Sequence, residues 1–345
     1  MKKEINTRKN INLIITRERS EQTIVNENKT INNTDLKLED MERAPGTVIG
    51  NIRYYLKGYS SLSKFKLSSL VLATTMVGYA MAPGPFSIPI FFLSSVGTGF
   101  TIFSAAAINQ IIEVKNDSEM LRTKRRWLPT QKIGLTHAKL FAATCGVSGV
   151  TMLYTINPLA SALALFNLVL YTSVYTPMKQ KQPLNTWVGA IVGAVPPMIG
   201  WAASTGGLEA GSWVLGALLA FWQMPHFMAL SYSLKDDYHR GGFRMLINTN
   251  PEKVTGVLLR YSLAMMPLGF LAYLCDMTTV WFAVDSLLPT GYLSYLAIKF
   301  YKNPDRDQAR SIFKFTLLML PLLLGLMIFH KIPRREQIKQ EGENK

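Results

Sequence analysis

The sequence predicts an all-α membrane protein in which about nine transmembrane helices form one bundle. Three observations support this prediction. The chain has 345 residues, of which 48% are hydrophobic and only 17% are charged, so it is poorer in charge than a typical soluble protein. Apolar segments of bilayer-spanning length recur along it, separated by charged gaps. Lys and Arg concentrate in alternate gaps, as they do in polytopic membrane proteins.

Nine apolar segments are predicted to cross the membrane, because each approaches the roughly 20 residues that a helix needs to span the hydrocarbon core. Gly, Ala, Ser and Thr are frequent inside them, which favours close packing of the helices into one bundle. In chain order, the segments are 67–82, 88–108, 133–154, 158–175, 186–203, 211–231, 258–274, 279–298 and 312–329.

The two ends of the chain differ in composition from these segments. Residues 1–50 are rich in Asn, Thr and charges of both signs and contain no apolar run that could build a core, so disorder is predicted there. Their basic start weakly resembles an organelle-import peptide, which normally has more Arg and Ser and almost no acidic residues. The sequence therefore predicts an N-terminal extension over 1–50, a membrane domain over 51–330 and a polar tail over 331–345.

Charge asymmetry orients the predicted bundle. Basic gaps precede the first segment and follow the second, fourth, sixth and eighth, whereas the other gaps between segments lack Lys and Arg. Short basic loops stay on the side from which a protein is inserted, so these gaps are expected on one membrane face. The basic C-terminal tail, which nine segments place on the opposite face, is the exception. The net charge of +15 is thus explained by topology, and no nucleic-acid partner is expected.

A polar stretch, "NQIIEVKNDSEMLRTKRR", follows the second segment. At 100° per residue, Asn109, Glu113 and Asp117 advance by only about 40° per step, so they form one ridge on the last helical turns. Spacing alone leaves two interpretations open. The acids either lie in water, paired with Lys115 or Arg122, or face the bundle interior as functional carboxylates.

A second acidic pair, Asp236 and Asp237, follows the sixth segment and is expected on the same face. Carboxylates from two helix ends suit Mg²⁺, which keeps several waters and binds phosphate oxygens. Nearby Arg and Lys side chains suit the phosphates themselves. The sequence therefore predicts a magnesium and diphosphate site, from which a carbon chain departs as a cation. The basic residues expected to neutralise the diphosphate are Arg122, Lys124 and Arg126.

Together these motifs resemble the intramembrane aromatic prenyltransferase superfamily, and within it most closely the branch that farnesylates heme. The similarity covers about residues 62–301. It rests on "MAPGPF", "SVGTG", "NQIIEVKNDSEMLRTKRR", "YTPMK", "NTWVGAIVGAVPPMIGWAASTG", "WQMPHF" and "DDYHRGGFRML", in this order. The chain departs from the superfamily at Lys115, where many members have a third acid, and at Phe65 and Trp127, where proline is usual.

The resemblance implies a reaction in a central prenyl-diphosphate cavity of the bundle. The farnesyl group of farnesyl diphosphate is transferred to a vinyl group of heme B, water adds, and diphosphate leaves. The product is heme O, from which the heme A of cytochrome c oxidase is made. Mg²⁺ is the implied cofactor, and proteins of heme A biosynthesis or oxidase assembly are implied partners. The expected location is the mitochondrial inner membrane with the active face toward the matrix, and a bacterial plasma membrane is the alternative.

The resemblance also implies residue roles. Asn109, Glu113 and Asp117 would hold Mg²⁺ or water around the diphosphate. Asp236 and Asp237 would complete the metal site. The phosphate oxygens would be clamped by Arg122, Lys124, Arg126 and Lys179.

The sequence leaves two alternative roles open for each of two further residues. Tyr175, at the end of the fourth segment, either stabilises the allylic cation through its ring or anchors the helix at the membrane interface. His226, beside Pro225, is a candidate axial ligand of the heme iron. The favoured alternative is that His226 forms a hydrogen bond that shapes the bundle.

Two other functions also remain open. The prenyl acceptor could be a quinone-precursor aromatic compound, which keeps the same chemistry. A transporter would have a similar number of segments, but it should place charges near the middle of its spans. Here the acids lie at helix ends, which favours the transferase.

Overall fold

The computed structural model describes residues 48–332, and nearly all of this backbone is helical. The predictions for residues 1–47 and 333–345, including the import peptide and the side of the C-terminal tail, lie outside the described residues. The chain divides into two units after Gly58. The described part of the first unit is the beginning of α2 (Val48–Leu62). The second unit, from Tyr59 onward, contains the helical bundle.

Each of the nine predicted segments coincides with a helix or a broken helix, which confirms the all-α class. In order they are α3 (Phe65–Met81), α4 (Ile88–Ile112), α6 (Leu135–Ile156), α7 (Pro158–Val169) with the π-helix η1 (Leu170–Tyr175) and α8 (Thr176–Met178), α9 (Asn185–Thr205), α10 (Ala210–Ser233), α13 (Pro251–Ala264) with α14 (Leu268–Leu274), α15 (Val280–Lys302) and α16 (Arg306–Phe329). The short helices between them are α5 (Val114–Glu119), α11 (Lys235–Arg240) and α12 (Leu246–Thr249).

Seven helical stretches within the described residues are long and apolar enough to cross a membrane. The helix of the first predicted segment, α3, is shorter, with 17 residues. The helix of the eighth predicted segment, α15, is long but is not one of these seven apolar stretches. It carries Asp285, a proline and several tyrosines, which lower its mean hydropathy. Nine helices therefore occupy the predicted positions, whereas nine membrane crossings are not confirmed.

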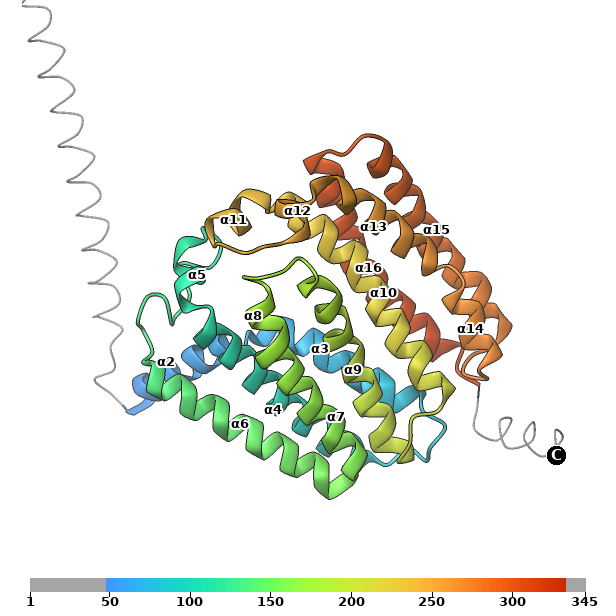
Figure 1. Ribbon diagram of the computed structural model, residues 1–345. Helices are drawn as coiled ribbons and strands as arrows, with labels where there is room; N and C mark the ends of the chain where they lie inside the picture. The colour runs from blue at the N-terminus through green and yellow to red at the C-terminus, as the bar shows by residue number, and fades with distance from the viewer. Residues whose placement is uncertain (1–47, 333–345) are drawn as a thin grey trace, which may run out of the picture. The chain divides into compact units, whose positions relative to one another are not determined.

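Helices that follow one another along the chain pack against each other. Contacts run from α3 to α4, α6, α7, α9, α10, α13, α15 and α16, each helix touching the next, and α16 returns to α3. Helix α10 also contacts α16, so it lies between α9 and the C-terminal helices (Figure 1).

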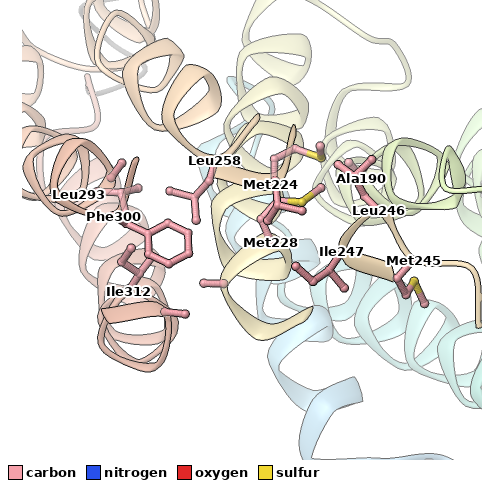
Figure 2. Packing of buried hydrophobic residues seen from close by; sticks show 14 of the residues in the cluster. Ala190, Met224, Met228, Met245, Leu246, Ile247, Leu258, Leu293, Phe300 and Ile312 are labelled. Carbon is pink, nitrogen blue, oxygen red and sulfur yellow. The ribbon is translucent and has the colours of Figure 1, made fainter. Parts of the chain in front are cut away.

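A hydrophobic cluster holds the end of α10 that precedes the second acidic pair. Figure 2 shows Met224 and Met228 of α10 within this cluster, and both are buried. The unbranched methionine side chains fill the irregular space between several helices. The surrounding buried side chains include Leu246 and Ile247 of α12, Leu258 of α13, Phe300 of α15 and Ile312 of α16.

Helices α3 and α9 approach closely at two glycines. A Cβ atom on Gly200 would lie 2.0 Å from the carbonyl oxygen of Thr75, and one on Gly78 would lie 2.0 Å from that of Pro197. Small residues permit such close backbone contact between membrane helices. Because the obstructing atoms belong to the backbone, a side chain at either position would force the helices apart.

We expect Gly200→Ala to destabilise the protein by about 2 kcal/mol, because overpacking a tight contact costs roughly 1–3 kcal/mol. The matched control is Gly325→Ala in α16, where no described atom lies within 4 Å of the added Cβ. Thermal unfolding of the two variants in detergent would test this difference. Equal unfolding temperatures would contradict it.

Candidate functional site

The segments that follow α4, α8 and α10 meet at one end of the bundle (Figure 1). Asn116 donates a hydrogen bond to the carbonyl oxygen of Gly241 at 2.7 Å, and Gln180 donates to the Asn116 side-chain oxygen at 3.0 Å. The backbone N–H of Arg244 donates to the carbonyl oxygen of Lys179 at 2.7 Å. These bonds confirm that the basic gaps after the second, fourth and sixth segments gather at one end.

A small pocket lies among these segments. It has a volume of about 70 Å³, which is enough space for ordered water. Its charged lining residues are Lys64, Glu113, Asp117, Arg122, Arg126 and Lys179. Its remaining lining residues are Met120, Tyr175, Phe227, Tyr238, Phe243 and Met245. Charged groups of both signs thus share one partly apolar recess.

The first motif forms a buried polar ridge, as its spacing predicts. Helix α4 ends before Glu113, whose φ of −93° and ψ of 9° mark the junction with α5. Helical hydrogen bonding nevertheless continues. The backbone N–H of Glu113 donates to the Asn109 carbonyl oxygen at 3.0 Å, and the backbone N–H of Asp117 donates to the Glu113 carbonyl oxygen at 2.8 Å. Asn109, Glu113 and Asp117 are only 0%, 4% and 2% exposed. Burial therefore excludes the interpretation in which the acids lie in water, and these side chains face the interior.

Each buried acid of this motif has a cationic partner. The Lys179 Nζ atom lies 2.8 Å from Glu113 Oε1, and an Arg126 guanidinium nitrogen lies 2.6 Å from Asp117 Oδ2. Lys64 donates to the side-chain oxygen of Asn109 at 2.5 Å. Buried charges require such compensation, because their desolvation is costly. The pocket is therefore lined by internal ion pairs.

The environment changes the pKa values of two of these lysines. Burial, together with the positive charges of Arg126 and Lys179, lowers the pKa of Lys64 to about 7. Burial also opposes the charge of Lys179, but the oxygens of Tyr175 and Glu113 outweigh it and raise the pKa of Lys179 above its ordinary value.

Lys64 is a pocket residue that the sequence motifs did not identify. It lies between α2 and α3 and has a left-handed backbone, with a φ of 48°. The sequence counted it only among the basic residues before the first segment. Lys64 directly precedes an apolar helix, on the face where the acids gather, and this position could have identified it as a pocket residue from the sequence.

Tyr175 lies on the pocket wall, at the end of the π-helix η1. Single π-helical turns are frequent at functional sites. The Lys179 Nζ atom lies 4.7 Å from the centroid of the Tyr175 ring. On the opposite helix, a Cβ atom on Gly189 would lie 2.7 Å from this ring. Tyr175 thus lies between a buried cation and α9, which favours the interpretation of a pocket residue over that of an interfacial anchor.

The second acidic pair does not reach the wall of this pocket. Asp236 is exposed and forms an ion pair with Arg306. Asp237 is buried and accepts hydrogen bonds from the backbone N–H groups of Leu121 and Arg122, in the loop after α5. Neighbouring residues on a helix point about 100° apart, so they cannot share one direction. Within the described part of the chain, no group of three His, Cys, Asp or Glu residues is arranged to hold a metal ion.

Two other predicted residues also lie elsewhere. Lys124 is exposed and is absent from the described pocket wall. His226 lies 2.9 Å from the Thr316 hydroxyl through Nδ1, and its ring stacks on Trp222 with a centroid distance of 4.6 Å. The adjacent Phe227 lines the pocket instead. These contacts favour His226 as a hydrogen-bonding residue of the bundle.

Comparison with known proteins identifies the family of this chain. Residues 71–320 match the UbiA prenyltransferase family. The chain is 49% identical over 273 residues to the mitochondrial protoheme IX farnesyltransferase of Homo sapiens. The match covers 79% of this chain and 62% of the human protein, so the chain spans less than two thirds of that relative.

Solved structures share the helical fold at low sequence identity. A structure of a digeranylgeranylglyceryl phosphate synthase has a TM-score of 0.69 at 18% identity and covers 80% of this chain and 98% of that chain. A UbiA homolog from Archaeoglobus fulgidus, bound to GPP and Mg²⁺, has a TM-score of 0.55 at 15% identity and covers 78% of this chain and 99% of that chain. With the family match extending over most of the membrane bundle, this chain belongs to the UbiA prenyltransferase family.

Proposed function

We propose that this chain transfers the farnesyl group of farnesyl diphosphate to a vinyl group of heme B, with addition of water, to make heme O. The observation that carries the proposal is the pair of buried carboxylates, each bound to a cation, at the end of an apolar helical bundle. Similarity to the human mitochondrial protoheme IX farnesyltransferase supports the choice of acceptor. The same similarity supports a mitochondrial membrane. The inner membrane, with the pocket toward the matrix, stays a prediction.

Glu113 and Asp117 fit a magnesium ion. Both carboxylates line the same pocket, and Mg²⁺ commonly binds one or two carboxylates together with waters and substrate phosphates. Asn109 lies on the same ridge and could hold a coordinated water. When bound, Mg²⁺ would neutralise the negative charge that grows on the departing diphosphate. The solved A. fulgidus homolog binds both GPP and Mg²⁺, which supports the assignment.

Substrate binding would require an exchange of partners. Two of the pocket cations, Lys179 and Arg126, contact the acids that would hold the metal ion. Lys179 and Arg126 would instead donate to phosphate oxygens, Arg126 through its planar fork and Lys179 as a point charge. Lys64 and Arg122, on the same wall, would add positive charge. Glu113 and Asp117 would then be available to the metal ion.

The proposed reaction begins with heterolytic cleavage between C1 of the farnesyl chain and the diphosphate oxygen. The leaving group keeps the electron pair, and the chain becomes an allylic cation. A vinyl carbon of heme B donates electrons to C1, and water adds to the resulting cation and loses a proton. The ring face of Tyr175 would stabilise the allylic cation. The nearby Phe227 and Phe243 would limit the access of water to this cation.

Several expected roles stay predictions. Those of Asp236 and Asp237 as metal ligands, and of Lys124 as a phosphate clamp, gain no support from their positions outside the pocket wall. Ligation of heme iron by His226 is likewise unsupported by its contacts. Partners from heme A biosynthesis or oxidase assembly are also a prediction.

The test is an assay of the detergent-purified full chain with farnesyl diphosphate, heme B and Mg²⁺. Mass spectrometry of the extracted hemes should detect a product that carries one added farnesyl group and one added hydroxyl group. Release of inorganic diphosphate should match the amount of this product. Omission of Mg²⁺ should abolish both signals.

Three outcomes separate the candidate functions. Prenylation of a quinone-precursor aromatic compound, with no modified heme, would show that this compound is the acceptor in place of heme B. Transport of a substrate into vesicles without cleavage of farnesyl diphosphate would show that the protein is a transporter and not a transferase. Formation of the farnesylated heme by purified protein would establish the proposal.

We expect Gly189→Ala to lower turnover about tenfold. The new methyl group would meet the Tyr175 ring and displace it from Lys179, and misplacement by about 1 Å can reduce a rate by up to roughly a hundredfold. The control is Gly291→Ala in α15, whose Cβ would meet no described atom within 4 Å. Farnesyl transfer by both variants would be compared with wild type. Equal rates for all three would contradict a role for the ring position.

A further inference from the structure

We propose that Asp237 is a positioning residue, which holds the segment from Met120 to Arg126 against the pocket, and that it does not ligate the metal. This segment, called the arginine segment below, supplies two cations of the pocket wall, Arg122 and Arg126. The inference rests on the proposed function and assigns a separate task to the second acidic motif.

Both carboxylate oxygens of Asp237 are engaged. Oδ1 accepts a hydrogen bond from the backbone N–H of Leu121 at 2.8 Å and one from the Arg240 guanidinium at 2.9 Å. Oδ2 accepts from the backbone N–H of Arg122 at 3.3 Å. Asp237 is only 5% exposed. A buried carboxylate from α11 thus binds consecutive backbone amides at the start of the arginine segment.

The other end of the segment is held by the first motif. Arg126 pairs with the Asp117 side chain at 2.6 Å, and the Thr123 hydroxyl donates to the Asp117 backbone oxygen at 2.9 Å. Asp237 and Asp117 therefore act at opposite ends of one loop. Because Arg126 would leave Asp117 when a diphosphate arrives, the bonds to Asp237 would keep the segment in place.

The charge state of Asp237 suits this task. Burial opposes its ionisation, but the hydrogen bonds from Arg240, Leu121 and Arg122 outweigh burial and hold the pKa of Asp237 below its ordinary value. An ionised carboxylate forms stronger hydrogen bonds with N–H groups than a neutral one does. To ligate a metal, Asp237 would have to release these N–H groups.

Asp236 is a matched control on the same short helix. Its side chain is 63% exposed and pairs with Arg306, so its removal should leave the arginine segment in place. The comparison needs three variants, Asp237→Ala, Asp237→Asn and Asp236→Asn. Asp237→Asn keeps the size of the side chain and one acceptor oxygen, so it provides the test even if Asp237→Ala fails to fold.

The first measurement is amide hydrogen exchange of the full chain in detergent, without metal or substrate. Asp237→Ala should accelerate exchange at Leu121 and Arg122 about tenfold or more, and Asp237→Asn should do so to a smaller extent. Asp236→Asn should match wild type. Unchanged exchange in the Asp237 variants would overturn the proposal. This readout does not depend on activity, so it remains decisive even if the protein fails to farnesylate heme.

The second measurement separates positioning from metal binding. Asp237→Asn should raise the KM for farnesyl diphosphate about tenfold, because Arg122 and Arg126 are misplaced. The Mg²⁺ concentration for half-maximal rate should stay within about twofold of wild type. A rise of about tenfold in this Mg²⁺ requirement would overturn the proposal, whatever the exchange data show.

Discussion

Asp117→Asn is expected to reduce farnesyl transfer about a thousandfold or more. Asp117 is one of two buried carboxylates on the pocket wall that are proposed to hold Mg²⁺. A metal that stabilises the leaving diphosphate contributes several kcal/mol to the transition state, and a thousandfold corresponds to about 4 kcal/mol. The substitution also removes the partner of Arg126, so the loop between them would lose one anchor.

Measurement of kcat/KM over a range of Mg²⁺ concentrations would test this expectation. The control is Glu119→Gln, which neutralises an exposed acid at the end of the same short helix α5 and should keep near-normal activity. Chromatography in detergent would show whether each variant is folded. Retention of more than about a tenth of wild-type activity by folded Asp117→Asn would refute the metal assignment.

Lys179→Met is expected to destabilise the substrate-free protein by about 3 kcal/mol. Its side chain and that of Glu113 are only 12% and 5% exposed. Removal of one member of a buried ion pair leaves the other charge without compensation, which typically costs about 3–5 kcal/mol. The double variant Glu113→Gln/Lys179→Met should recover most of this loss, because neither charge then remains. It should nevertheless be inactive, since the proposed metal ligand and the proposed phosphate-binding cation are both absent.

Chemical denaturation of the single and double variants forms a double-mutant cycle that isolates the coupling between the two side chains. Lys181→Met is the control, because Lys181 is exposed two residues further along the chain and should have little effect. If the double variant were no more stable than Lys179→Met alone, the ion pair would not account for the loss.

The helix positions could be predicted closely, because membrane helices are defined by local composition. The predicted segment 88–108 became α4 (Ile88–Ile112), and 211–231 became α10 (Ala210–Ser233). The errors at the ends follow from polar helical turns beyond the apolar core. Such turns hold Asn109 and Gln110 in α4, where both residues are buried against other helices. Hydropathy alone cannot distinguish such buried amides from residues in water.

The candidate site was only partly predictable for the same reason. Four-residue spacing placed Glu113 and Asp117 on one ridge, and that ridge lines the pocket. The same argument could not orient Asp237, which turns toward backbone amides of another loop. Nor could it identify Lys64, whose partner Asn109 lies 45 residues further along the chain. Hydrogen bonds between distant segments leave no periodic signal in the sequence.

By itself, the sequence determined the all-α class, the positions of the helices and the gathering of basic gaps at one end, because apolar length and charge asymmetry act locally along the chain. Only the tertiary structure decided which charges meet. It paired Glu113 with Lys179 and Asp117 with Arg126, and it separated Asp236 from Asp237. The physical reason is that burial and partner choice depend on how helices pack in space, and packing brings together residues that spacing along the chain cannot relate.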